Sequence, residues 1–255
     1  MRRAPGALLA SAGRLLSPAH IAMLINSGLA SVMVIRQPLV RIVSAPGSST
    51  TDSNGPMCRA LVERDGGVVD DIVAAERTRQ GIRRALETEG TDIVLVIGGT
   101  GPGAGDHAAA ALAEAGDLAI HGIALRPGET AGLGHTRREV SVILLPGSPA
   151  ACFCAYEMLA GRAIRRLGGH DPATPYRPRV MRTARKIVSA IGMTEICPVR
   201  CTASDVVEPL PSFSEIGLMA AVAADGFVIV PEEREGYPQG APVNVYLYEG
   251  SCIGG

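Results

Sequence analysis

The chain has 255 residues, of which 47% are hydrophobic, with 24 basic and 25 acidic side chains and a formal net charge of -1. Neither disorder nor a general electrostatic affinity for nucleic acid follows from this balance, and the length is enough for one large or two smaller domains. Only 3% of the residues are aromatic, so stacking platforms for single-stranded nucleic acid are not expected either.

The six cysteines show neither a disulfide framework nor zinc spacing, since Cys197 and Cys201 lack a second pair of ligands. The apolar run at the N-terminus is interrupted at Arg14 and is too short to span a bilayer. We therefore expect a cytoplasmic protein that does not enter a membrane.

The first predicted element is a helix over residues 17–27, with Ser17 as N-cap, Pro18 in the first turn and Gly28 at the end. Residues 1–30 are assigned to this N-terminal lead-in helix. Across residues 31–168, apolar runs alternate with helical patterns. Strands are predicted at 32–35, 40–43, 68–73, 93–97, 118–125 and 140–145, and helices at 54–63, 74–89, 106–115 and 149–167. This alternation predicts an α/β domain, with a mostly parallel sheet covered by helices on both faces.

The composition changes after this domain. Residues 169–178 are rich in residues that break helices and strands, and we predict a linker there. Residues 179–255 are predicted to form a small, mostly β domain. Its strands are expected at 180–191, 195–199, 227–230 and 243–247, with a short helix at 214–224.

A glycine-rich loop follows the predicted strand at 93–97. Five of the eight residues in this loop are glycine: Gly98, Gly99, Gly101, Gly103 and Gly105. Glycine lets the backbone approach a ligand closely, and the unpaired N–H groups at the start of the next helix suit a phosphate. Asp106 ends the loop and would repel a bare phosphate, so it indicates a bridging Mg²⁺ or a catalytic role.

Other interpretations of this loop remain open. The stretch from Gly99 to Ala104 formally fits a dinucleotide fingerprint, but the next strand ends in Arg126 rather than an acid, which leaves only NADP. A P-loop is excluded because no Gly-Lys-Ser/Thr follows. A tight turn without a ligand is the plain alternative. Likewise, Asp52 and Asn54 are explained simply as capping residues of the helix that they open.

Several motifs in order resemble one known family, the MoeA-type (gephyrin E-domain-type) molybdopterin molybdenumtransferases, in a truncated form. The resemblance rests on Gly98-Gly99-Thr100-Gly101 with Gly105-Asp106, on Asp52-Ser53-Asn54, on His121 to Gly128, on Leu145-Pro146-Gly147-Ser148-Pro149-Ala150, and on Asp225 to Pro231 with Gly240 to Tyr248. The segment from Leu16 to His20, followed by Leu24 to Gly28, is similar to the one that precedes the domain in that family. The resemblance implies a molybdopterin-binding α/β domain over residues 31–168, followed by a C-terminal β domain.

The resemblance also implies a function. Family members bind molybdopterin, usually as its adenylate, and insert molybdate at the dithiolene with Mg²⁺. Carried over to this sequence, Asp106 and Asp52 would be catalytic, with Asp106 holding the metal. The ligand-binding residues would be Gly98, Gly99, Thr100, Gly101, Gly103, Gly105, Ser53, Asn54, Arg126, Pro146, Gly147 and Ser148. The family further implies a homodimer, with other cofactor-biosynthesis proteins or a molybdoenzyme as partners.

Three departures weaken the expected catalysis more than the expected binding. Residues 45–48 stand where the family has T-G-D-E, so those carboxylates are missing. Glu129 replaces the second lysine of K-P-G-K, and Ser148 replaces the asparagine of L-P-G-N-P. A catalytically silent molybdopterin carrier or sensor is therefore an alternative, and a molybdopterin adenylyltransferase is another, because Gly-Gly-Thr-Gly also resembles those enzymes.

Overall fold

The computed structural model describes residues 8–47, 52–87 and 89–249, and it divides into two units, one up to Arg36 and one from Gln37. The first unit contains helix α1 (Pro18–Asn26), which begins at a capping box formed by Ser17 and His20. This confirms the predicted helix and its N-cap Ser17, whereas the role of His20 was not predicted. The predicted strand at 32–35 is absent, since residues 29–38 have no regular secondary structure. Nowhere in the described ranges does a helix have the length and apolar character needed to cross a bilayer.

The second unit is built on a six-stranded sheet with the order β2-β1-β3-β7-β6-β4. Its strands are β1 (Leu39–Ser44), β2 (Val68–Ala74), β3 (Ile93–Ile97), β4 (Gly116–His121), β6 (Gly132–Thr136) and β7 (Ser141–Leu145). The first three and β7 are mutually parallel, whereas β6 and β4 continue the sheet in antiparallel fashion. The prediction of a mostly parallel sheet is confirmed for the four strands whose carboxyl ends meet at one edge.

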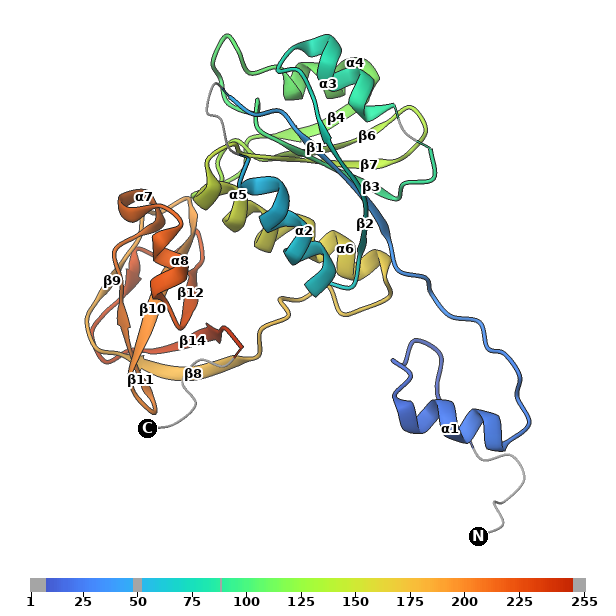
Figure 1. Ribbon diagram of the computed structural model, residues 1–255. Coiled ribbons are helices and arrows are strands. Elements are labelled where there is room, and N and C mark those ends of the chain that lie inside the picture. The colour runs from blue at the N-terminus through green and yellow to red at the C-terminus, as the bar shows by residue number, and fades with distance from the viewer. Residues whose placement is uncertain (1–7, 48–51, 88, 250–255) are drawn as a thin grey trace. The chain divides into compact units, whose positions relative to one another are not determined.

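Helices cover both faces of this sheet (Figure 1), which confirms the predicted three layers. One face packs against α3 (Arg79–Leu86) and α4 (Ala108–Ala115). The other packs against α2 (Asn54–Arg64) and a long helical run made of α5 (Pro149–Ala155), the π-helical segment η1 (Tyr156–Ala160) and α6 (Gly161–Leu167). The central strand β3 is buried along its whole length, as expected for a strand covered on both sides.

A second six-stranded sheet, of order β11-β8-β14-β12-β10-β5, forms the C-terminal β domain. Its elements are β5 (Leu125–Arg126), β8 (Pro178–Thr183), β10 (Thr194–Ala203), β11 (Val206–Pro209), β12 (Gly226–Val230) and β14 (Pro242–Leu247), beside the small pair β9 (Ile187–Val188) and β13 (Gly236–Tyr237). Two short helices, α7 (Phe213–Ile216) and α8 (Met219–Ala223), complete it. Figure 1 shows this domain as a separate lobe below the first sheet.

The structure corrects four predicted elements. The helix predicted at 74–89 begins only at Arg79, because Ala74 belongs to β2 and Thr78 is the N-cap of the helix. The strand predicted at 118–125 is two strands in different sheets, separated at Gly122, whose φ of 86° turns the chain. The run at 180–191 is divided between β8 and β9, and the helix predicted at 214–224 is interrupted at Gly217, whose φ is 62°. Left-handed φ values of this kind are readily adopted only by glycine and end regular structure.

A buried ion-pair cluster joins α2, the π-helical segment and the linker. The Asp65 carboxylate accepts bonds from Arg165 at 2.7 Å and from Arg64 at 2.9 Å. The Glu157 carboxylate, on the π-helical segment, accepts from Arg64 at 2.6 Å and from the Tyr176 hydroxyl at 2.8 Å. The side chain of Glu157 is only 2% exposed. Because buried charges are stable only when paired, this cluster fixes residues 169–178 against the α/β domain.

The cysteines differ from expectation at one position. Cys201 is disulfide-bonded, although its spacing in the sequence did not predict a disulfide. Cys58, Cys152, Cys154 and Cys197 are free and buried. Burial raises the pKa of the Cys197 thiol to about 12, so this thiol behaves as a core residue rather than a nucleophile.

Candidate functional site

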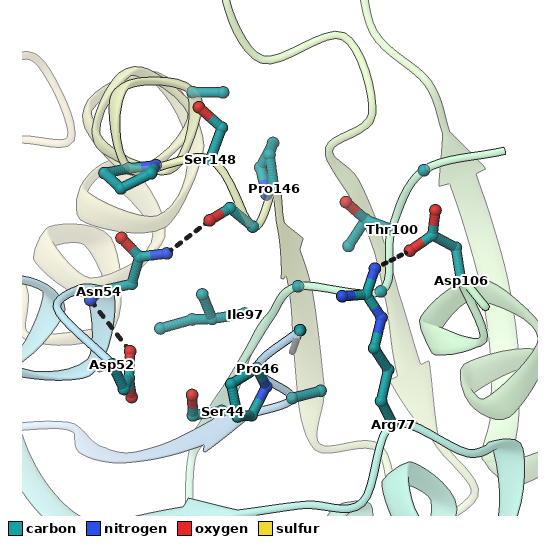
Figure 2. Close-up of a pocket in the computed structure, with 18 of the residues that line it drawn as sticks. Ser44, Pro46, Asp52, Asn54, Arg77, Ile97, Thr100, Asp106, Pro146 and Ser148 are labelled. Atoms are coloured by element: carbon teal, nitrogen blue, oxygen red, sulfur yellow. Dashed lines mark hydrogen bonds and ion pairs between the residues drawn. The ribbon is translucent and has the colours of Figure 1, made fainter. Parts of the chain in front are cut away.

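A cavity of about 590 Å³ lies at the edge of the sheet where β1, β3 and β7 end (Figure 2). In open α/β sheets this edge is where ligands bind. Three segments far apart in the sequence meet there: the glycine loop after β3, the start of α2, and the turn between β7 and α5. The sequence-predicted residues that line the cavity are Asp52, Ser53, Asn54, Gly98, Gly99, Thr100, Gly101, Asp106, Pro146, Gly147 and Ser148.

The glycine loop is shaped by close packing of the strand ends. Gly98 and Gly99 have φ values of 87° and 68°, in the left-handed region. A Cβ on Gly98 would stand 2.7 Å from the carbonyl oxygen of Ala45, at the end of β1, and a Cβ on Gly147 would stand 3.4 Å from the Cα of Gly98. The backbone therefore forms the floor of the cavity, and no side chain fits at Gly98.

Thr100 is held by two residues that were not predicted as part of the site, Thr130 and His121. Its hydroxyl lies 3.0 Å from that of Thr130, and its carbonyl oxygen accepts a bond from His121 Nε2 at 2.8 Å. A carbonyl oxygen can only accept, so Nε2 carries the proton. Thr130 also lines the cavity. These contacts tie the loop to β4 and to the segment after β5.

The start of α2 combines two roles. The Asp52 carboxylate accepts bonds from the backbone N–H groups of Asn54 and Gly55, at 3.0 and 3.1 Å, so Asp52 caps the helix. The Asn54 amide donates to the carbonyl oxygen of Gly147 at 2.9 Å, which ties α2 to the β7–α5 turn. That donor fixes the amide orientation and leaves Asn54 Oδ1 buried, without a partner in the part of the chain that the structure describes.

Asp106 is paired with an arginine that the sequence analysis missed. Arg77 Nη2 donates to Asp106 Oδ1 at 2.5 Å, and Arg77 Nε donates to the carbonyl oxygen of Gly105 at 3.1 Å. The second oxygen, Asp106 Oδ2, accepts from the backbone N–H of Gly103 at 3.1 Å. Arg77 follows β2, which is a neighbour of β1 in the sheet. Because ligands bind at the carboxyl ends of the strands in such sheets, a residue directly after β2 could have been predicted as part of the site.

Three predicted binding residues do not line the cavity. Gly103 and Gly105, in the second half of the loop, do not line the cavity, but their backbones bond to Asp106 and Arg77. Arg126 is on β5, which pairs with β10 of the C-terminal domain, and its Nε lies 3.4 Å from Glu129 Oε1. The break at Gly122 carries Arg126 away from the first sheet, so the structure does not bring Arg126 together with the glycine loop.

The carboxylates around the cavity bear on the predicted Mg²⁺. Among residues 8–47, 52–87 and 89–249, no group of three or more His, Cys, Asp or Glu side chains is placed to hold a metal ion. Mg²⁺ is usually bound by one or two carboxylates together with substrate phosphates. Here the Asp52 carboxylate caps α2, and both oxygens of Asp106 accept hydrogen bonds. This donor set does not fit a resident Mg²⁺.

The mostly parallel sheet, covered by helices on both faces, with a polar cavity at its carboxyl edge and a β domain attached, defines an α/β ligand-binding protein. Residues 31–166 match the family described as a probable molybdopterin binding domain, and residues 180–248 match the MoeA C-terminal region, domain IV. The chain belongs to this molybdopterin-binding family.

Curated relatives agree with this assignment. The chain is 28% identical to a molybdopterin molybdenumtransferase of Staphylococcus aureus, over 96% of this chain and 62% of the relative. It is 26% identical to a putative molybdopterin biosynthesis protein of Methanocaldococcus jannaschii, over 95% of this chain and 63% of the relative. The chain thus spans less than two thirds of the length of these relatives.

A solved structure shares the fold over almost the whole chain. A molybdopterin biosynthesis MoeA protein from Pyrococcus horikoshii superimposes with a TM-score of 0.75 and 26% identity, over 96% of this chain and 63% of that one. A molybdenum cofactor biosynthesis protein from Pyrococcus furiosus gives 0.70 and 26%, over 91% of this chain and 76% of that one. Both lobes therefore belong to one known architecture.

Proposed function

We propose that this chain binds molybdopterin, or adenylyl-molybdopterin, in the cavity at the carboxyl edge of the sheet and takes part in molybdate insertion during molybdenum cofactor biosynthesis. The observation that carries the proposal is the meeting of the glycine loop, the start of α2 and the β7–α5 turn around one cavity, within residues that match a molybdopterin-binding family. A cavity of about 590 Å³ is in the range that holds a cofactor-sized ligand.

The residues of the cavity suggest how such a ligand is held. Backbone N–H groups of the glycine loop would face its phosphate. Asn54 Oδ1 is buried and unpartnered among the described residues, and an unpaired buried acceptor is costly, so it would accept an N–H from the pterin ring. The Ser148 hydroxyl, at the N-cap of α5, makes no capping bond to the helix and would contact the ligand. Asp52 would act by holding Asn54 in place.

The proposed activity is that of a transferase. It is supported by the relatives named molybdopterin molybdenumtransferase, whose length this chain covers only in part. Molybdate would enter as the second substrate, and the product would pass to a molybdoenzyme. A cytoplasmic location and a homodimer belong to the same proposal. Mg²⁺, with Asp106 as its ligand, remains a prediction that the donor set of the site does not support.

A second candidate is a molybdopterin carrier that binds without inserting molybdate. It is favoured by one observation: neither carboxylate of the site is free, because Asp52 caps α2 and Asp106 is paired with Arg77. A proton-transfer or metal-holding role would require one of them to change partners.

Reconstitution distinguishes the two candidates. The purified chain is incubated anaerobically with adenylyl-molybdopterin and molybdate and then mixed with an apo-molybdoenzyme. Recovery of the molybdoenzyme's activity, above a control without the chain, supports the transferase. Binding of adenylyl-molybdopterin without recovery supports the carrier. Failure to bind molybdopterin in either form refutes both.

A further inference from the structure

Arg77 presents to the cavity hydrogen-bond donors that no described residue accepts from. A guanidinium carries five N–H donors, and within the described part of the chain two of those on Arg77 are used, one by Gly105 and one by Asp106. Of the two terminal nitrogens, Nη2 points at Asp106, while Figure 2 shows the other directed toward the middle of the cavity. The Arg77 side chain is 38% exposed, so its remaining donors are accessible from the cavity.

The charges around the glycine loop are balanced by this arginine. Only Asp52, Arg77 and Asp106 carry charge among the described residues that line the cavity. The Asp52 carboxylate faces the positive start of α2, which offsets its charge. That leaves Asp106 beside the loop, where it would repel a phosphate. Arg77 neutralises it with a charge-assisted bond and keeps free donors for a second anion.

We propose that Arg77 is a ligand-binding residue that holds the anionic group of the substrate, a phosphate monoester or a diphosphate, and that this binding does not require Mg²⁺. The identity of the ligand rests on the proposed function, whereas the anion site rests on the contacts of Arg77. Asp106 is then a positioning residue: it orients the guanidinium, together with the carbonyl oxygen of Gly105. A guanidinium suits this task because its planar fork matches phosphate oxygens.

The test is calorimetric titration with molybdopterin under anaerobic conditions, once in excess EDTA and once in excess magnesium chloride. We expect the same affinity for the wild-type chain in both buffers. Arg77→Gln should weaken binding about ten- to hundredfold, since hydrogen bonds to charged groups contribute about 1.5–3 kcal/mol. Arg79→Gln is the matched control, because Arg79 is exposed and pairs with Glu114 outside the cavity, and it should bind like the wild type.

Asp106→Asn separates this proposal from a metal site by the sign of its effect. Removing the carboxylate charge next to Arg77 should leave the affinity for molybdopterin equal or higher. Loss of affinity in this variant, or a wild-type affinity that falls in EDTA, overturns the proposal. Wild-type affinity in Arg77→Gln overturns it as well. Melting temperatures of all variants are compared first, so that an unfolded variant is recognised. If Arg77→Gln does not fold, Arg77→Lys, which keeps the charge, replaces it.

If molybdopterin does not bind at all, the proposed function is refuted. A second probe then still tests the anion site at Arg77. Inorganic pyrophosphate is titrated in EDTA into the ¹⁵N-labelled chain. We expect amide shifts at Gly98 to Gly101 in the wild type and their loss in Arg77→Gln. Absence of these shifts in the wild type overturns the anion site itself.

Discussion

Replacing Gly98 by alanine tests whether contact between β1 and β3 fixes the shape of the cavity floor. Gly98 has a φ of 87°, and a residue with a Cβ in the left-handed region costs about 1–2 kcal/mol. The new Cβ would also stand 2.7 Å from the carbonyl oxygen of Ala45. The backbone fixes the position of the Cβ, and the carbonyl oxygen is a backbone atom, so no rotamer change relieves the contact; overpacking of this kind costs about 1–3 kcal/mol. Gly98→Ala should therefore lower the free energy of unfolding by about 2–5 kcal/mol.

Gly105→Ala is the matched control within the same loop. A Cβ at Gly105 would meet nothing within 4 Å, and its φ lies outside the left-handed region. The variant should be as stable as the wild type or more stable by up to about 1 kcal/mol, because alanine restricts the unfolded chain. Urea denaturation followed by circular dichroism measures both free energies. Equal destabilisation of the two variants would refute the steric explanation of the loop.

Two further predictions concern the buried ion-pair cluster. Glu157→Ala removes a buried carboxylate that pairs with Arg64 and should cost about 3–5 kcal/mol of unfolding free energy. Glu63→Ala, at an exposed pair, should cost less than about 1 kcal/mol. Similar losses for the two variants in urea denaturation would contradict this. Burial raises the pKa of Tyr156 and Tyr176, so the stability that they contribute is complete below pH of about 10 and is lost as the pH rises through their folded-state pKa values. The unfolding free energy should fall above pH about 10 by up to about 1.4 kcal/mol per pH unit for each tyrosine, and a flat alkaline profile would refute the effect.

Much of the fold could be predicted because the apolar runs are unambiguous. The strand at 93–97 is a continuous buried run of β-branched and leucine residues, and the helix at 149–167 begins at a Ser-Pro pair, so both were predicted within a residue. The strand at 118–125 was not, because sequence alone does not show that Gly122 adopts a φ of 86° and sends the chain to another sheet. That single turn also explains why Arg126 is not at the cavity.

The site was predictable to the extent that it consists of strand ends. The glycine loop and the Pro146 to Ser148 turn both follow buried strands, and parallel topology brings them together. Arg77 was missed because residues 74–89 resemble one long polar helix, whereas Arg77 lies in the loop between β2 and α3, at the carboxyl end of the sheet. The contacts of Thr130 and His121 depend on tertiary packing, for which periodicity gives no signal.

The most direct test of the central claim is a nuclear magnetic resonance titration of the ¹⁵N-labelled chain with molybdopterin under anaerobic conditions. Binding in the cavity predicts saturable amide shifts at Gly98, Gly99 and Ser148, around the sheet edge where β3 and β7 end. Amides of the C-terminal strand β14 should not move. Unchanged spectra, or shifts confined to the C-terminal β domain, would contradict the claim that this cavity is the molybdopterin site.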